Sequence, residues 1–127
     1  MPKRILVIED NGPIRRLIKT YLRQEGYEVL EAEDGQQGLE IFEAQPIDLV
    51  ILDMVMPRKD GMETLMDLRV KLPALGILAV SGGDGNGPEP YLEIAARYGA
   101  NAVLPKPFGK HGLIRAVGKA IKSTAEF

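Results

Sequence analysis

Two adjacent acids end the first apolar segment of the chain. Glu9 ends the segment RILVIE (4–9) and Asp10 follows it, shortly before a Gly-Pro pair and a basic helical pattern. Neighbouring carboxylates repel each other and resist joint ionisation unless a cation or a proton lies between them. The pair is therefore either a solvated turn or half of a metal site, and the rest of the sequence has to decide between these two.

The remaining chain alternates short apolar segments with helical patterns. The predicted strands are residues 4–9, 27–32, 48–53, 75–80 and 101–105. Their nearly continuous apolar character is typical of parallel strands that are buried on both faces. Strands that alternate with helices in this way predict an α/β fold, a doubly wound five-stranded parallel sheet with five helices on its two faces.

The helical segments carry apolar side chains at helical spacing, and these predict their inner faces. The expected sets are Ile14, Leu17, Ile18, Tyr21 and Leu22; Gly35, Gly38, Leu39 and Phe42; Met62, Leu65 and Met66; Tyr91, Leu92, Ala95 and Ala96; and Leu113, Ile114, Val117 and Ile121. Pro13 suits a first helical turn, and Asp34 can cap the second helix. The basic side chains of the first helix are expected on a solvated face, and they are Arg15, Arg16, Lys19 and Arg23.

Polar side chains follow four of the five predicted strands. Glu9 and Asp10 follow the first strand, Asp53 ends the third, Ser81 follows the fourth, and Lys106 follows the fifth. Ligands of open parallel sheets bind outside the carboxyl ends of the strands, so we expect these side chains to converge. Three carboxylates suit a hard divalent cation, best Mg²⁺, which favours phosphate as a further ligand. A lysine and a hydroxyl add what a phosphoryl group needs, and the cation makes the adjacent acids tolerable.

Composition excludes several other classes of protein. The 127 residues are 45% apolar and 27% charged, which is ordinary for one globular domain. The absence of cysteine excludes disulfides and thiolate metal sites. No apolar run reaches the length of a membrane span and no signal peptide is evident, so we expect a cytoplasmic protein without a membrane partner. A net charge of -2 gives no electrostatic reason for this domain to bind nucleic acid.

Four short motifs in register resemble the response-regulator receiver domain of two-component signalling. They are IED after the first strand, LDMVMPRKDG around Asp53, VSG after the fourth strand and PKPF near the end. The resemblance covers essentially the whole chain and is to single-domain chemotaxis-type regulators. It implies a flavodoxin-like fold with strand order 2-1-3-4-5.

The resemblance also implies a metal site. Asp10 matches the direct Mg²⁺ ligand, and Glu9 matches the acid that acts through water. Asp53 and the backbone carbonyl of Val55 match the remaining protein ligands. Mg²⁺ is thus the expected cofactor.

A phosphoryl-transfer role follows from the same resemblance. Asp53 matches the phosphoacceptor, which takes its phosphoryl group from a histidine kinase or a histidine phosphotransfer protein. Ser81 matches the hydroxyl that moves toward the new phosphate, and Lys106 matches the ammonium that pairs with its oxygens. The Lys106–Pro107 peptide bond is expected to be cis.

The predicted function is a phosphorylation-dependent signalling switch that changes the binding of a downstream protein target. Such a domain is no turnover enzyme, although it assists its own phosphoryl transfer and dephosphorylation. Two alternatives stay open: a receiver domain truncated from a longer regulator or hybrid kinase, and a pseudo-receiver that works without phosphorylation. Residues 1–122 are expected to form the receiver domain and residues 123–127 a C-terminal tail or a remnant of cloning.

The chain departs from the family pattern near the predicted site. Val103 stands three residues before Lys106, where the family usually carries an aromatic side chain that turns inward during switching. The loop after the fourth strand, SGGDGNGPEP, is longer than a typical βα connection. We expect residues 82–88 to respond to phosphorylation in place of the missing ring.

Overall fold

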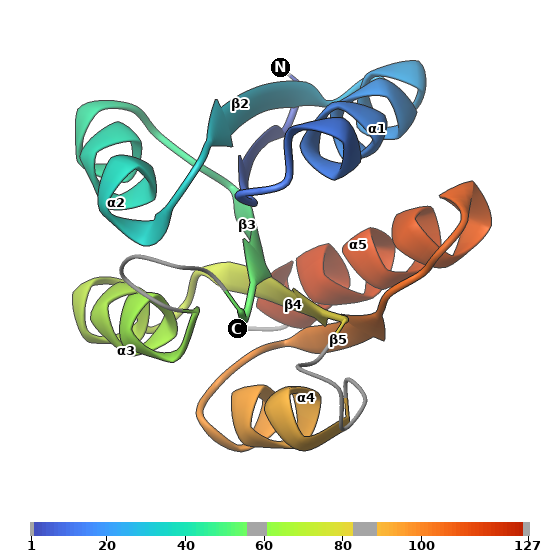
Figure 1. Ribbon diagram of the computed structural model, residues 1–127. Helices are drawn as coiled ribbons and strands as arrows, with labels where there is room; N and C mark the ends of the chain where they lie inside the picture. The colour runs from blue at the N-terminus through green and yellow to red at the C-terminus, as the bar shows by residue number, and fades with distance from the viewer. Residues whose placement is uncertain (1, 56–60, 83–88, 126–127) are drawn as a thin grey trace.

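A five-stranded parallel sheet forms the centre of the protein (Figure 1). The computed structural model describes residues 2–55, 61–82 and 89–125. The strands are β1 (Arg4–Ile8), β2 (Glu28–Ala32), β3 (Leu49–Asp53), β4 (Gly76–Ser81) and β5 (Ala102–Pro105), in the order β2-β1-β3-β4-β5. The fold class, the strand order and the position of every strand are as predicted. No strand boundary differs from its predicted position by more than one residue.

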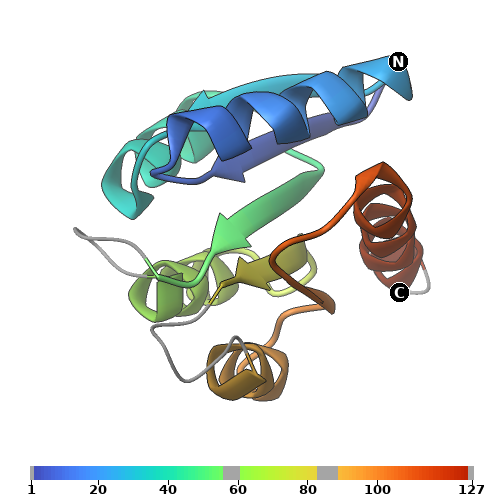
Figure 2. The same cartoon turned by 45° about the vertical axis from the view of Figure 1, so that its right-hand side comes forward.

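Five helices cover the two faces of the sheet. They are α1 (Gly12–Gln24), α2 (Gly35–Ala44), α3 (Gly61–Lys71), α4 (Glu89–Arg97) and α5 (Lys110–Ala125). Helices α1 and α5 lie on one face, and α2, α3 and α4 lie on the other (Figures 1 and 2). No helix among the described residues is long and apolar enough to cross a membrane.

The strands divide their side chains between two apolar cores. Leu6 and Ile8 of β1 point into the core beneath α2, α3 and α4, whereas Ile5 and Val7 point into the core beneath α1 and α5. This division follows from the alternation of side chains along a strand. All four are fully buried, which explains why the sequence of β1 is apolar at consecutive positions.

Side-chain caps begin the first two helices. The Asn11 side chain accepts a hydrogen bond from the backbone N–H of Ile14 at 2.9 Å, and a proline lies in the first turn of α1. The carboxylate of Asp34 accepts a hydrogen bond from the backbone N–H of Gln37 at 2.8 Å. Such caps satisfy amide groups that have no partner inside the helix. The Asp34 cap is confirmed.

The predicted inner face of α3 is wrong at one position. Leu65 is fully buried and Met62 packs against the core, as predicted, but the side chain of Met66 is 51% exposed. The buried residue of the next turn is Leu68, which lies three positions after Leu65. Because residues three apart share a helix face, Leu68 contacts the sheet and Met66 points away from it.

Candidate functional site

The pairing register of the sheet brings the predicted site residues to one edge. Ile8 of β1 pairs with Leu52 of β3, so Glu9 and Asp53 follow at the same level on neighbouring strands. The chain leaves β1 toward β2 on one side and returns to β3 on the other, so this edge is the topological switch point of the sheet.

Three carboxylates meet at this edge. Glu9, Asp10 and Asp53 each place one carboxylate oxygen within 4.8 Å of the others. The side chains of Glu9 and Asp53 are buried, with residue exposures of 1% and 2%, whereas Asp10 is exposed. Two buried acids with a third at the surface form a cluster that is open to solvent on one side.

Lys106 contributes the positive charge of the cluster. Its ammonium lies 2.6 Å from Glu9 Oε1 and 3.5 Å from Asp53 Oδ2. Its backbone N–H donates to the carbonyl of Ser81 at 2.9 Å, and the Lys106–Pro107 peptide bond is cis, as expected. The ammonium therefore pairs with both buried carboxylates and lies closer to Glu9.

Ser81 and Val55 complete the set of predicted residues. Ser81 is fully buried at the end of β4 and pairs with Pro105 of β5, one residue before Lys106. The backbone N–H of Val55 donates to Asp53 Oδ1 at 3.2 Å, so the Val55 main chain lies beside the carboxylate. All six predicted site residues thus belong to one cluster of strand ends.

The environment of Asp53 opposes its ionisation. Burial and then the neighbouring Glu9 carboxylate raise the pKa of Asp53 from 3.8 to about 8, although Lys106 and the Val55 N–H act in the opposite direction. Burial raises the pKa of an acid because the charged form loses its hydration, and a like charge adds to this effect. A further cation beside Asp53 would favour its ionised form.

A hard divalent cation fits this donor set. The ligand atoms are carboxylate oxygens, which Mg²⁺ prefers, and their negative charge exceeds that of Lys106. Within the described residues, Glu9 Oε1 is buried and accepts no hydrogen bond, although the Lys106 ammonium is in ion-pair contact with it. Because a carboxylate oxygen has two lone pairs, Glu9 Oε1 can accept from a metal-bound water in addition to its contact with Lys106.

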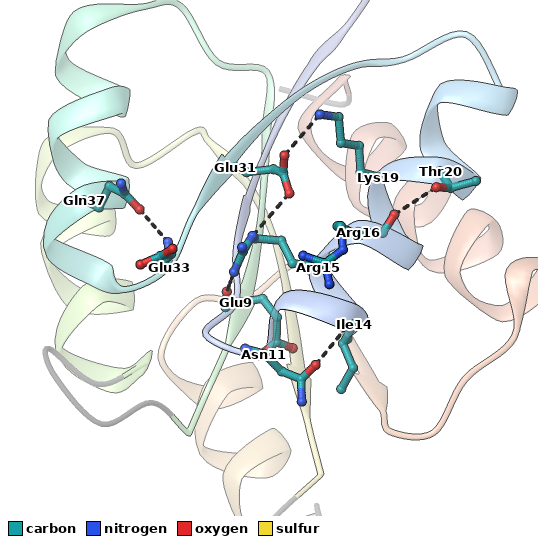
Figure 3. A network of polar contacts seen from close by, with 10 residues as sticks. All are labelled: Glu9, Asn11, Ile14, Arg15, Arg16, Lys19, Thr20, Glu31, Glu33 and Gln37. Atoms are coloured by element: carbon teal, nitrogen blue, oxygen red, sulfur yellow. Dashed lines mark hydrogen bonds and ion pairs between the residues drawn. The ribbon is translucent and has the colours of Figure 1, made fainter.

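A network on α1 holds the turn that carries the first two acids (Figure 3). The guanidinium of Arg15 donates to the backbone carbonyl of Glu9 at 2.8 Å and to Glu31 of β2 at 3.2 Å. Lys19 contacts the other oxygen of Glu31 at 3.1 Å. The prediction of a solvated basic face is therefore wrong for Arg15 and Lys19, because Glu31 draws both toward the sheet. The sequence signal for this contact was an arginine in the first turn of the helix that follows the acidic pair.

Some of the predictions fall on residues that the structure leaves undescribed. Residues 56–60, which belong to the motif after Asp53, and residues 83–88 of the long loop lie outside the described residues. Val103 is described: it lies on β5, pairs with Ala79 of β4 and is 37% exposed.

The fold and the site define a doubly wound α/β protein with a cluster of acidic side chains at its switch point. Residues 5–118 match the family model of the response regulator receiver domain. The chain belongs to this family. It is a receiver domain of two-component signalling, a family in which phosphorylation and Mg²⁺ binding are general features.

Curated relatives of the chain are bacterial regulators. It is 38% identical to the transcriptional regulatory protein PdtaR of Mycobacterium tuberculosis over 129 residues, which cover 99% of this chain and 60% of the relative. It is 35% identical to the response regulator MprA of Mycolicibacterium vanbaalenii, with 98% of this chain and 52% of the relative covered. The chain thus spans about 60% or less of the length of these relatives.

Solved structures with the same fold include isolated receiver domains. A response regulator receiver domain protein from Clostridium thermocellum is 32% identical, with a TM-score of 0.88 and 98% of both chains covered. The response regulator TrrA of Thermotoga maritima, solved in complex with Mg²⁺ and BeF, is 34% identical, with a TM-score of 0.82 and 93% of this chain and 98% of that chain covered.

Proposed function

We propose that Asp53 accepts a phosphoryl group from the phosphohistidine of a histidine kinase or a histidine phosphotransfer protein. The observation that carries this proposal is the placement of the Asp53 carboxylate, which is buried at the end of β3 beside two further acids and the Lys106 ammonium. Acids and a lysine in this arrangement suit a group that brings its own negative charge and binds together with a divalent cation.

The same residues supply the proposed metal ligands. Asp10, Asp53 and the backbone carbonyl of Val55 would hold Mg²⁺ directly, and Glu9 would act through a bound water. When bound, Mg²⁺ supplies positive charge that keeps the carboxylates ionised and offsets the charge of the phosphoryl oxygens. The TrrA structure was solved with Mg²⁺ and BeF, which supports the assignment by similarity.

Phosphoryl transfer then requires little chemistry from the chain itself. A carboxylate oxygen of Asp53 attacks phosphorus, the new O–P bond forms as the N–P bond to histidine breaks, and the departing imidazole nitrogen takes up a proton. The Lys106 ammonium, 3.5 Å from Asp53 Oδ2, pairs with the transferred oxygens, and the Ser81 hydroxyl hydrogen-bonds to them. Positioning and charge stabilisation of this kind dominate catalysis of phosphoryl transfer. The same groups assist later hydrolysis of the aspartyl phosphate, so the domain acts as a phosphoacceptor and no metabolite is turned over.

The new charge is proposed to alter the binding of a downstream protein target. A phosphoryl group brings nearly two negative charges and strong acceptor oxygens, which compete with Glu9 for the Lys106 ammonium. Movement of Lys106 is coupled to β4 through its backbone hydrogen bond to Ser81.

We also propose residues 1–122 as the receiver domain and residues 123–127 as a tail, although α5 itself continues to Ala125.

An apolar pocket next to Lys106 is the proposed docking surface for the phosphodonor. Ile14 and Leu17 of α1 line it together with the segment after β5, and Leu17 is 43% exposed. A donor protein has to bring its phosphohistidine to Asp53, so the donor surface around that histidine must lie against the surface that adjoins the site. Leu17→Ala should slow transfer from a phosphorylated histidine phosphotransfer domain that serves the wild type, but not from a small phosphodonor. Leu72→Ala, which removes an exposed leucine after α3, is the control.

Intact-mass measurement tests the phosphoacceptor directly. Incubation with phosphoramidate and Mg²⁺ should add the mass of one phosphoryl group to the wild type, and chelation of Mg²⁺ should prevent it. Asp53→Asn should abolish the gain, whereas Asp48→Asn, just before the opposite end of β3, should not. A gain that persists in Asp53→Asn would refute the assignment, and a wild type without any gain would favour a pseudo-receiver.

A further inference from the structure

The guanidinium of Arg15 joins three separate parts of the fold. It projects from α1, contacts Glu31 Oε1 of β2 at 3.2 Å through Nε, and donates through Nη1 to the backbone carbonyl of Glu9 at 2.8 Å (Figure 3). Its side chain is only 12% exposed. A planar fork of donors can make both contacts at once, which a single ammonium cannot.

These contacts act on the backbone of the acidic turn. The N–H of Glu9 donates to the carbonyl of Ala32 at 3.0 Å, and its carbonyl accepts the bond from Arg15. The peptide unit before Glu9 is therefore held from β2, and the unit between Glu9 and Asp10 is held from α1. Asp10 itself is exposed and its side chain forms no hydrogen bond or ion pair with another described residue, so only its main chain limits where its carboxylate can lie.

We propose that Arg15, anchored by Glu31, is a positioning residue that holds the Asp10 carboxylate ready for Mg²⁺. The inference rests on the proposed metal site. Glu31 keeps the guanidinium directed at the Glu9 carbonyl and balances its charge, so that Arg15 does not act as a competing cation at the acidic cluster. Burial works against ionisation of Glu31, but Lys19 and Arg15 outweigh it and lower the pKa of this carboxyl.

A matched pair of substitutions distinguishes the positioning role of Arg15 from the effect of its positive charge. Arg15→Met removes the fork and one positive charge, and Arg16→Met removes one positive charge from the next residue of the same helix, whose side chain is exposed. Loss of a nearby positive charge alone favours binding of a cation, so Arg16→Met should leave Mg²⁺ affinity unchanged or slightly raised. Arg15→Met should lower it about tenfold, as is usual when an outer partner of a metal ligand is lost. Isothermal titration calorimetry of metal-free protein with MgCl₂ gives both affinities.

A second readout distinguishes positioning from general stability. In Arg15→Met the Mg²⁺ concentration that gives half-maximal phosphorylation by phosphoramidate should rise, while the rate at saturating Mg²⁺ stays near that of the wild type. Arg15→Lys restores the charge but not the fork, so it should recover little of the lost affinity. If Arg15 only stabilised the fold, Arg15→Met would lower the free energy of unfolding without changing either Mg²⁺ measurement.

Glu31→Gln provides an independent test that leaves Arg15 in place. As a single substitution it should lower Mg²⁺ affinity severalfold. Combined with Arg15→Met it should have no further effect, because Glu31 acts on the metal site only through the Arg15 guanidinium. If the wild type binds Mg²⁺ and Arg15→Met or Glu31→Gln binds it as tightly as Arg16→Met does, the positioning role is refuted. A wild type that binds no Mg²⁺ would instead refute the proposed metal site.

Discussion

The Lys106 ammonium lies 2.6 Å from Glu9 Oε1 and 3.5 Å from Asp53 Oδ2, so one cation serves two buried carboxylates. Among the described residues, three acids, with Asp10 at the rim, face a single lysine. A site with this excess of negative charge is stable only when a proton or a second cation joins it. This relationship links the stability of the domain to its proposed ligand.

Stability without metal should fall as pH rises. The pKa of Asp53 is raised from 3.8 to about 8 in the folded protein, so between these values the folded state keeps a proton that the unfolded state has lost. The contribution is fully present below the lower value and is lost as pH rises through the upper one. Urea unfolding in EDTA from about pH 5 to about pH 9 should show a declining free energy of unfolding.

Asp53→Asn should remove most of that decline. The neutral amide needs no proton, and it ends the repulsion with Glu9, so metal-free protein at the upper end of this pH range should gain about 1–4 kcal/mol. Asp48→Asn, just before the opposite end of β3, should retain the decline of the wild type. A free energy of unfolding with equal pH dependence in the wild type and Asp53→Asn would contradict this account.

Lys106→Met should destabilise the metal-free protein and leave Mg²⁺ binding intact. Without the ammonium, Glu9 and Asp53 lose their shared counter-charge, and breaking a buried ion pair in this way costs about 3 kcal/mol or more. Added Mg²⁺ should restore much of the loss, whereas phosphorylation at Asp53 should be strongly slowed. Thermal unfolding with and without Mg²⁺ measures the first effect. Lys119→Met, on an exposed part of α5, should change neither property.

Gly61→Ala should disturb the site through the backbone. A Cβ atom at Gly61 would lie 2.3 Å from Met54 Cα and 2.7 Å from the Asp53 carbonyl oxygen, so the main chain after β3 would have to move. We expect lower stability and weaker Mg²⁺ binding by titration calorimetry.

Gly118→Ala provides the contrast. Nothing lies within 4 Å of a Cβ there, so the change should raise the free energy of unfolding by about 0.5–1 kcal/mol through helix propensity and leave Mg²⁺ affinity unchanged. Equal Mg²⁺ affinity in both alanine variants would contradict the role given to Gly61.

Arg69→Met should destabilise the fold without affecting the metal. From α3 the guanidinium donates to the carbonyls of Leu75 and Gly99, both at 2.5 Å, and to the Asn101 side chain at 2.6 Å. These bonds join the segments before β4 and β5, at the edge of the sheet opposite the acids. Loss of a charged donor to several carbonyls should cost about 2–3 kcal/mol in urea unfolding.

Lys71→Met is the matched surface control for that change. Lys71 pairs with Glu43, but both side chains are well exposed, and pairs of this kind contribute at most about 1 kcal/mol. If Lys71→Met lowered the free energy of unfolding as much as Arg69→Met does, Arg69 would stabilise the fold through its charge and not through its buried hydrogen bonds.

The sequence was sufficient to predict the strands and to predict which polar side chains lie together at their carboxyl ends. Parallel strands buried on both faces are nearly continuous apolar segments, so β1, β3 and β4 are evident from local composition. The parallel strands all end at the same edge of the sheet, so the acids after β1, Asp53 at the end of β3 and the lysine after β5 were expected on that edge. Neither step needs any knowledge of how the helices pack.

Only the tertiary structure decided which groups pair inside that site and what holds it. Whether Lys106 lies closer to Glu9 or to Asp53 depends on distances across the four strands from β1 to β5, which no periodicity specifies. Arg15 belongs to an apparently solvated helix face until α1 is placed over β2, where Glu31 binds it. Local sequence determines which side chains share a face of an element, whereas contacts between elements depend on packing and register, which are properties of the whole fold.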